Sequence, residues 1–271
     1  MKHTLYLVLI IGILVGLGAC VQNQKEPTNI ALPATEGAGA AQSDVLYHYS
    51  IWKAFVNKIF ASALTAKELK TKGDLALGSY DDLDGELIML NGILFRASEN
   101  GQVNTVEDHT PIAYATAAFF ETDQSFALPK INNYKQLREA IKAQMISKNI
   151  FYAFKIKGHF SKMKCGKLHK QGQPFTEGED VLIQKRPVFV RENFKGTMVG
   201  FFCPDFVENV NVANYHLHVV SEDRAFAGHV MEVEAENLIV EMDYMYDYQL
   251  VLPRSEEFLQ GNFEKELQCQ K

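Results

Sequence analysis

The sequence predicts an α+β fold, in which a mixed β-sheet region with two helices is followed by a region that is mostly β. Two segments with helical apolar spacing lie in the first half of the chain, and short apolar runs separated by Gly/Asp turns lie between them. Beyond residue 150, strand-like runs rich in aromatic and β-branched residues follow one another. We therefore expect an α+β domain over residues 46–150 and a β-rich domain over residues 151–271.

The first residues predict an export signal that is not part of this fold. A short basic start precedes an apolar run that ends in Leu-Gly-Ala-Cys at residues 17–20. The run is shorter than the roughly 20 apolar residues that a membrane span needs. Because the segment resembles a bacterial lipobox, we expect residues 1–19 to be removed and Cys20 to be lipidated. A plain signal peptide with an incidental cysteine is the alternative.

Lipid on Cys20 would anchor the mature protein at a membrane surface outside the cytoplasm, on the periplasmic side or at the cell surface. Residues 20–45 are rich in Ala, Gly, Gln, Pro and Thr, and they predict a flexible linker after the anchor. Nucleic acid is not an expected partner, because the net charge is -6 and no long run of Lys or Arg occurs.

The other cysteines exclude some common motifs. Three of them follow Cys20, and an odd number outside the cytoplasm implies at least one free thiol or an intermolecular bond. No CxxC pair occurs, so a zinc ribbon and a thioredoxin-like site are both excluded. These cysteines are Cys165, Cys203 and Cys269.

The first region begins with a predicted helix over residues 51–66. Its core-facing stripe consists of Trp52, Phe55, Ile59 and Phe60. Residues 73–97 alternate Gly/Asp turns with apolar runs, and they predict β-hairpins with a turn at Asn91-Gly92.

A second helix is expected over residues 133–147, because Asn133 can cap its start. Its apolar face consists of Leu137, Ile141 and Met145. After residue 150 we expect strands in the segments IFYAFKIKGHF, TMVGFFCP, NYHLHVV, GHVMEVEAENLIVEMDY and YQLVLP.

The segment YHLHVVSEDRAFAGH, residues 215–229, contains three of the eight histidines. In a strand, residues i and i+2 point to the same face, so His216 and His218 project side by side. An antiparallel hairpin would return His229 beside this pair. Three imidazoles with an open fourth position are the donor set of catalytic zinc sites.

Spacing alone leaves alternatives to a catalytic metal site. A bare HxH in a strand is more often a surface or partner-facing pair than a metal site. The stretch HLHVVSE, which ends at Glu222, also matches the start of a cupin metal motif, so a cupin-like metal oxygenase is a second alternative. The glycine that this motif has six residues before the first histidine is absent, because Val210 stands there.

Several segments together resemble the α-acetolactate decarboxylase family, from about residue 46 to the C-terminus. The most specific is PD-x5-NV-x2-YHLH-x2-SEDR-x3-GHV, within residues 195–230. The others are GDLALGSYDDLDGELIMLNG at 73–92, TPIA at 110–113 and VLPRSEEF at 251–258. The resemblance implies a mixed-sheet domain next to a β-barrel-like domain, and a homodimer that forms through the first domain.

The resemblance also implies a site. It assigns a divalent metal, usually zinc, to His216, His218 and His229. It assigns an acidic active-site residue to Glu86, in the LDGE segment, and a site-lining residue to Ser79, where the family usually has threonine.

Two departures from the family concern groups around the metal. The family's active-site arginine falls here on Gly166 or Lys167, and we expect Lys167 to hold the substrate carboxylate or to deliver a proton. Lysine lacks the fork of an arginine, so we expect a weaker decarboxylase, in which an arginine at either position raises activity. A further family glutamate lies in the C-terminal tail, at Glu264 or Glu266.

The implied function is that of a carboxy-lyase of acetoin and butanediol biosynthesis, which converts 2-acetolactate to acetoin and CO2. A divalent metal would act as a Lewis acid on the negative charge that develops as CO2 leaves. Glu86 would orient the substrate or handle the proton. A non-catalytic metal- or ligand-binding lipoprotein is the competing interpretation, because the arginine is missing and acetolactate is made in the cytoplasm.

Overall fold

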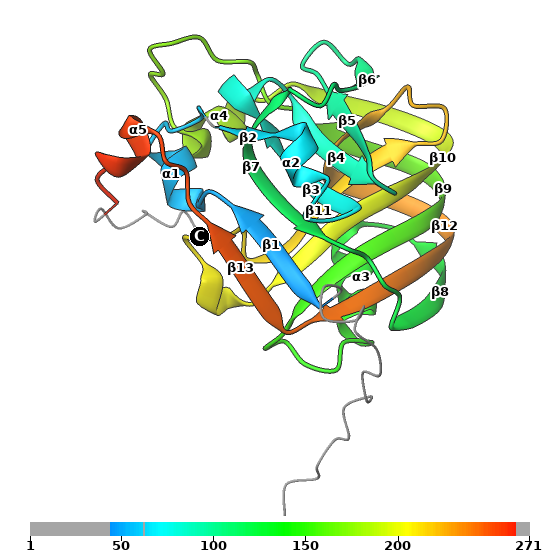
Figure 1. The fold of residues 1–271 in the computed structure, drawn as a ribbon. Helices are drawn as coiled ribbons and strands as arrows, with labels where there is room; N and C mark the ends of the chain where they lie inside the picture. The colour runs from blue at the N-terminus through cyan, green and yellow to red at the C-terminus, as the bar shows by residue number, and fades with distance from the viewer. Residues whose placement is uncertain (1–43, 62, 264–271) are drawn as a thin grey trace, which may run out of the picture. The chain divides into compact units, whose positions relative to one another are not determined.

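The computed structural model describes residues 44–61 and 63–263, which are mostly β with a few short helices (Figure 1). Sheet A contains β1 (Val45–Tyr49), β2 (Leu64–Thr65), β3 (Leu75–Tyr80), β4 (Glu86–Leu90), β5 (Ile93–Ala97), β6 (Val103–Thr105), β7 (Pro111–Ala118) and β13 (Asp247–Val251). Sheet B contains β8 (Gln124–Ile131), β9 (Phe151–Gly166), β10 (Val188–Cys203), β11 (Asn214–Ser221) and β12 (Ala227–Met245). The helices are α1 (Trp52–Val56), α2 (Ala66–Leu69), α3 (Tyr134–Lys142), α4 (Glu179–Lys185) and α5 (Glu256–Leu259). The predicted fold class is confirmed.

Sheet A is a mixed sheet with the strand order β13-β1-β7-β3-β4-β5-β6, and β2 pairs with β7. β1 runs parallel to β13 and antiparallel to β7. The tight turn between β4 and β5 lies at Asn91-Gly92, as predicted, and both residues have positive φ values, 51° and 74°. A hairpin turn of this twist needs positive φ at both positions, which Asn-Gly tolerates.

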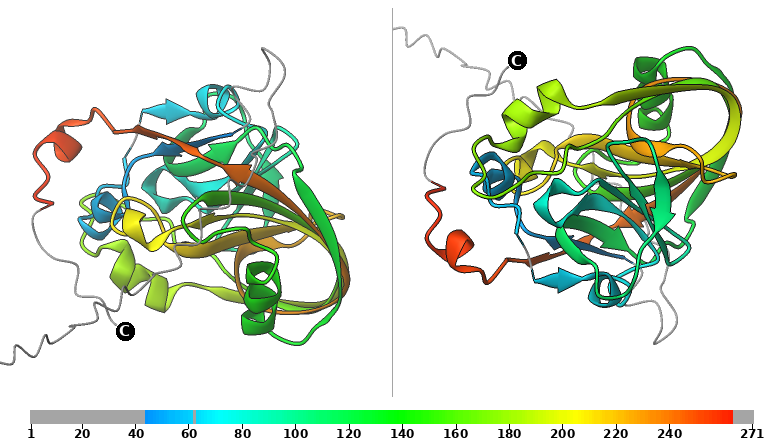
Figure 2. Two further views of the ribbon diagram at one scale, coloured as in Figure 1. Left: turned by 90° about the horizontal axis from the view of Figure 1, so that it is seen from below. Right: turned by 90° about the horizontal axis from the view of Figure 1, so that it is seen from above.

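Sheet B closes on itself in a barrel-like arrangement. β11 pairs antiparallel with β10 and also with β12, so the pairings β11-β10-β9-β12 return to β11. β9, β10 and β12 are 16 to 19 residues long, and register shifts between β9 and β12 allow them to bend. Figure 2 shows the resulting curl of these strands. The barrel-like region implied by the family resemblance is therefore confirmed.

The two sheets pack face to face through alternate residues of their strands. Leu77 of β3 and Ile88 of β4 are fully buried and share a core with Phe201 of β10. Side chains two positions apart in a strand point to the same face. Ser79 and Glu86 therefore also point toward sheet B.

α3 covers the opposite face of sheet B (Figure 2). Leu137 and Ile141 are fully buried there, in one cluster with residues of β9, β10, β11 and β12. The side chain of Asn133 accepts a hydrogen bond from the backbone N–H of Gln136, as its predicted capping role requires. The helix ends earlier than expected, and it packs on sheet B rather than on the sheet of the first region.

α1 is much shorter than the single helix predicted over residues 51–66, and this prediction is wrong. The side-chain amide of Asn57 donates to the carbonyl oxygen of Lys53 at 2.7 Å, and Lys58 leaves the helix with a φ of 66°. The spacing of apolar residues correctly predicted burial, because Phe55, Ile59 and Phe60 all lie in the core. Phe55 belongs to α1, whereas Ile59 and Phe60 follow the turn after it.

Two strands cross the domain division expected near residue 150. β8 precedes this point but pairs with β12 in sheet B. β13 follows it but pairs with β1 in sheet A. The two domains stay a prediction, and the sheets do not follow that division strand for strand.

Some expected features lie outside the described residues. They are the signal sequence, Cys20, nearly all of the linker, Cys269, and the tail glutamates Glu264 and Glu266. In the part that the structure describes, no helix combines the length and hydropathy needed to cross a membrane. Cys165 and Cys203 are both buried there as free thiols.

Candidate metal centre

β11 and β12 bring three histidines together. His216 and His218 share one face of β11, and His218 pairs directly with His229 in the register of the two strands. One nitrogen of each ring lies within 4.8 Å of the others. The hairpin thus returns His229 beside the first pair.

The close approach of β12 to β9 beside His229 requires a glycine. Gly228 has a φ of +148°, and a Cβ atom there would lie 2.8 Å from the carbonyl oxygen of Gly166. His229 pairs in register with Gly166. A larger residue at 228 would push β12 away from β9 and would carry the imidazole of His229 with it.

A hydrogen bond sets the tautomer of His218. Its Nδ1 lies 2.9 Å from the carbonyl oxygen of Leu87 in β4, which can only accept, so Nδ1 carries the proton and donates it. Nε2 then holds a lone pair, and it lies 3.2 Å from Nε2 of His216. Two nitrogens bound to one tetrahedral ion at about 2.05 Å would be roughly 3.3 Å apart. The two rings are therefore spaced as ligands of a single ion.

Burial keeps the three rings neutral. Removal from water lowers the pKa of His216 and that of His229 well below the usual value, and it lowers the pKa of His218 to about 4. Neutral imidazole is the form that binds a metal. Nδ1 of His216 is buried and has no hydrogen-bond partner among the described residues. The three-histidine cluster could therefore hold a metal ion.

Glu86 faces the same histidines from the start of β4. Its Oε2 lies 3.6 Å from Nε2 of His218, and its side chain is almost fully buried. Burial, and then the nearby Glu179, raise the pKa of Glu86 well above its usual value. Ser79 pairs with Glu86 across β3 and β4, and its hydroxyl donates to the carbonyl oxygen of Tyr80 at 3.1 Å.

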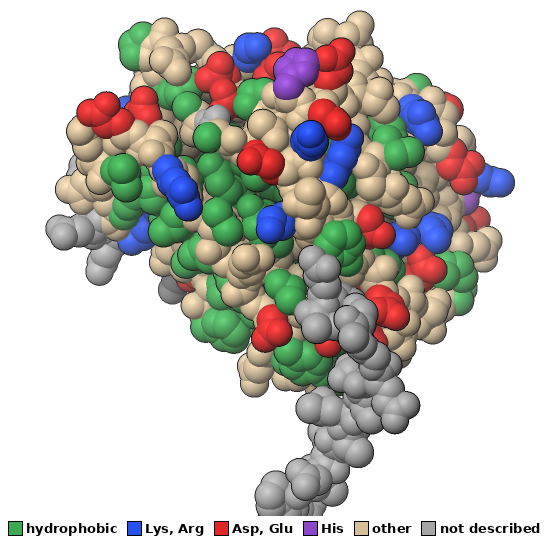
Figure 3. Space-filling view, in the orientation of Figure 1, with side chains coloured by type: hydrophobic (Ala, Val, Ile, Leu, Met, Phe, Trp, Pro, Cys, Tyr) green, Lys and Arg blue, Asp and Glu red, His purple; other side chains and the backbone are tan. Residues whose placement is uncertain are grey.

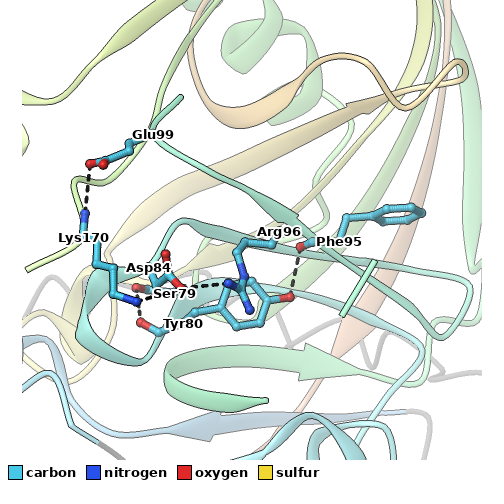
Figure 4. Close-up of polar contacts among 7 residues, drawn as sticks. All are labelled: Ser79, Tyr80, Asp84, Phe95, Arg96, Glu99 and Lys170. Carbon is cyan, nitrogen blue, oxygen red and sulfur yellow. Dashed lines mark hydrogen bonds and ion pairs between the residues drawn. The ribbon is translucent and has the colours of Figure 1, made fainter. Parts of the chain in front are cut away.

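Two ion pairs hold the turn that precedes Glu86. A carboxylate oxygen of Asp84 lies 2.7 Å from the guanidinium of Arg96 and 3.4 Å from the ammonium of Lys170 (Figure 4). Gly85 has a φ of +97°, and a Cβ atom there would lie 2.7 Å from a backbone oxygen of β5. These features define where β4 begins, and thereby the direction in which Glu86 points.

A pocket of about 1250 Å³ opens onto the cluster. Its walls come from β3, β4, β7, α1, α4 and the loop before β11, and they include Ser79, Glu86, His216 and His229. A pocket of this size can admit a small organic molecule. The structure therefore combines a candidate metal site with space for a ligand beside it.

The sequence predictions missed Glu179 and Arg186, which are among the charged residues that line this pocket. Glu179, the first residue of α4, is buried, and burial raises its pKa to about 8. Arg186 follows α4, and its positive charge acts against this rise. The sequence carries no signal for either residue, because their position depends on how a short, irregularly patterned segment docks against α1.

Lys167 is not among the residues that line the pocket. Its side chain is buried, and its ammonium nitrogen lies 4.3 Å from the centre of the Phe189 ring. Its positive charge still acts on Glu86, where it opposes the rise in the pKa of that carboxyl. The role assigned to Lys167 from the sequence stays a prediction.

Comparisons with known proteins agree on one family. Residues 46–265 match the family model described as Alpha-acetolactate decarboxylase. An alpha-acetolactate decarboxylase of Methanosarcina mazei is 34% identical over 226 residues, which cover 83% of this chain and 78% of that protein. One of Brevibacillus brevis is 31% identical, and the match covers 82% and 77% of the two chains. The crystal structure of alpha-acetolactate decarboxylase from Bacillus subtilis strain 168 matches with a TM-score of 0.79 at 26% identity, over 82% of this chain and 94% of that one.

We expect the purified protein to contain about one divalent metal ion per chain, and His216→Ala to lose most of it, because one of three neutral donors is removed. Elemental analysis by mass spectrometry measures this. The matched control is His109→Ala, since the side chain of His109 is 84% exposed. Stoichiometric metal in a His216→Ala/His218→Ala double variant would contradict the assignment.

Proposed function

The chain belongs to the alpha-acetolactate decarboxylase family, and from this premise we propose that it converts 2-acetolactate to acetoin and CO2. One observation carries the proposal: a cluster of three neutral histidines meets the buried Glu86 at the edge of one pocket, which His216, His229 and Glu86 line. A decarboxylation of this type needs a site that stabilises negative charge and a group that manages a proton. The pocket contains candidates for both.

We propose that His216, His218 and His229 hold a zinc ion, because three imidazoles with an open position are the donor set of catalytic zinc sites. When bound, the ion supplies Lewis-acid stabilisation of the charge that develops at the reacting carbon and its neighbouring ketone. The hydrogen bond from His218 to the carbonyl of Leu87 orients this ring and strengthens it as a ligand.

Glu86 is the group that we assign to the proton. Loss of CO2 leaves an electron pair on C2, which delocalises into the adjoining ketone, and acetoin forms when one proton is added to C2. Glu86 lies 3.6 Å from His218 and lines the pocket, so it is placed to orient the substrate and to deliver this proton to one face. Ser79 lines the pocket beside it, and because its hydroxyl donates to the carbonyl of Tyr80, its oxygen can accept a hydrogen bond from the substrate hydroxyl.

Two other functions make different predictions. A non-catalytic metal- or ligand-binding lipoprotein would hold the metal but would form no acetoin, and the position of Lys167 outside the pocket favours it. A cupin-like oxygenase would consume oxygen when loaded with iron. The family match favours the decarboxylase over both.

We expect the purified soluble domain to form acetoin from racemic 2-acetolactate, and a chelator to abolish this activity, because the charge left by CO2 would lose its stabilisation. Glu86→Gln should lower kcat/KM by roughly 100- to 10,000-fold, the usual range for losing a positioned acid or base. Glu107→Gln is the control, since its side chain is 81% exposed. Full metal content without acetoin formation would favour the binding protein.

We also propose that Cys20 is lipidated and anchors the protein outside the cytoplasm, because it follows an apolar run and a lipobox-like triplet. Cys20→Ser should move the protein from the membrane fraction to the soluble fraction, as judged by immunoblotting. An unmodified Cys20 in the intact mass of the mature wild-type protein would refute this prediction.

We further propose a homodimer formed through sheet A, as the family resemblance implies. Figure 3 shows apolar side chains gathered on the face that carries β1 and β13. At the end of this region Leu250 and Leu252 are 38% and 45% exposed. Sedimentation should show two chains, and Leu250→Lys should weaken their association, because it buries a charge. Ile146→Lys, beyond α3, is the control, and a wild-type monomer at all concentrations would argue against the dimer.

A further inference from the structure

We propose that Arg186 binds the carboxylate of the substrate, and that it reaches the pocket across the space left open by Gly166. The identity of the substrate in this inference rests on the proposed function. The inference goes beyond it, because it assigns the anion-binding role to a residue between α4 and β10, in a different part of the chain from Lys167.

The geometry of Gly166 shows where the side chain of Arg186 runs. A Cβ atom on Gly166 would lie 2.4 Å from Nε, 2.6 Å from Cδ and 2.9 Å from Cζ of Arg186. These separations are far below contact distance, so the guanidinium and its stem lie directly over the glycine. Gly166 therefore provides the passage that Arg186 uses.

The strand register places this passage beside the histidines. Gly166 at the end of β9 pairs with His229 of β12 on one side and with Val188 of β10 on the other. The backbone N–H of Lys167 donates to the carbonyl oxygen of Pro187 at 3.0 Å, which fixes the residue that follows Arg186. Arg186 thus leaves the chain just before β10, on one side of Gly166. Its side chain crosses over Gly166 toward β12, which carries His229.

The guanidinium is short of partners among the residues that the structure describes. Its Nε is buried and makes no hydrogen bond there, and no described carboxylate lies within ion-pair distance of it. Arg186 lines the pocket together with His216 and His229. A half-buried cation with a buried, unpaired Nε is costly unless an anion meets it. A carboxylate ligand would supply a two-pronged partner.

The other charges of the pocket fit a ligand that is an anion at one end. Glu86 and Glu179 line the same pocket, and the positive charge of Arg186 acts on both through space. The charge of Lys167 also acts on Glu86, but Lys167 does not line the pocket, and its ammonium group lies over the Phe189 ring. We therefore infer that Arg186 makes the pocket bind carboxylic acids more tightly than their uncharged analogues.

This arrangement changes one expectation from the sequence. An arginine at position 166 was expected to raise activity, but its Cβ atom would occupy the space of the Arg186 side chain. The backbone at Gly166 has no positive φ, so alanine fits the strand there. Gly166→Ala is therefore a selective probe, which displaces the guanidinium while it retains every charge.

The test measures binding of a non-reactive 2-hydroxy acid, 2-hydroxy-2-methylpropanoate, and of its uncharged amide to the zinc-loaded protein by titration calorimetry. Wild type should prefer the acid, and Arg186→Ala should lose roughly 10- to 100-fold of that preference, the range for one charged hydrogen-bonded contact. Gly166→Ala should lose part of it. Both should raise KM for acetolactate more than they lower kcat, with unchanged metal content.

Two variants serve as controls. Lys185→Ala removes an adjacent surface cation, and Gly172→Ala adds a methyl group where no atom lies within 4 Å. Both should bind the probes as wild type does. Circular dichroism checks that each variant folds. If Arg186→Ala does not fold, the acid preference of Gly166→Ala alone tests the inference.

The outcomes separate this inference from the proposed function. Unchanged acid preference in both Arg186→Ala and Gly166→Ala would overturn it, even in a protein that forms acetoin. Loss of preference in Arg186→Ala alone would support the carboxylate contact and overturn the passage over Gly166. An Arg186-dependent preference in a protein that forms no acetoin would support the contact and overturn the decarboxylase.

Discussion

β11 is hydrogen-bonded on both of its edges, to β10 and to β12, and this double pairing decides where the functional groups lie. A strand paired on both edges cannot change register without breaking two ladders, and a shift of one residue would turn every side chain to the other face. His216 and His218 are thereby held toward sheet A, beside His229. The histidine cluster is thus positioned by the backbone, and the bond from His218 to Leu87 ties it to the second sheet.

Burial then decides the charge of the groups that meet there. The three imidazoles are neutral, while Glu86 and Glu179 have raised pKa values and Arg186 remains a cation with free donors. Burying these groups together lowers the stability of the folded protein, because each group loses its hydration. The divalent ion and the anionic ligand that we propose would offset this cost. The charged groups of the pocket are therefore already in place to bind a charged ion or ligand.

The sequence predicted the positions of residues that depend on local periodicity. It did not predict the positions of residues that depend on how distant segments pack together. The spacing of two between His216 and His218 needs only a strand, and the turn at Asn91-Gly92 needs only its own backbone preferences. The helix over residues 51–66 failed because Asn57 and Lys58 end it locally while the apolar residues beyond them are still buried. Glu179 and Arg186 enter the pocket only because α4 docks against α1, where Gly178 allows a close approach to a carbonyl oxygen.

The exchange of strands between the two halves of the chain also bears on how the protein folds. Sheet A receives β13 from the C-terminal part, so Val45 pairs with Asp247, about 200 residues away. Contacts between such distant residues require a large loop to close before they contribute stability, which slows folding. A nascent chain that ends before β13 would also leave β1 with an unpaired edge, which is a template for aggregation. We therefore expect this protein to fold slowly, and one edge of β1 to stay unpaired until synthesis reaches β13.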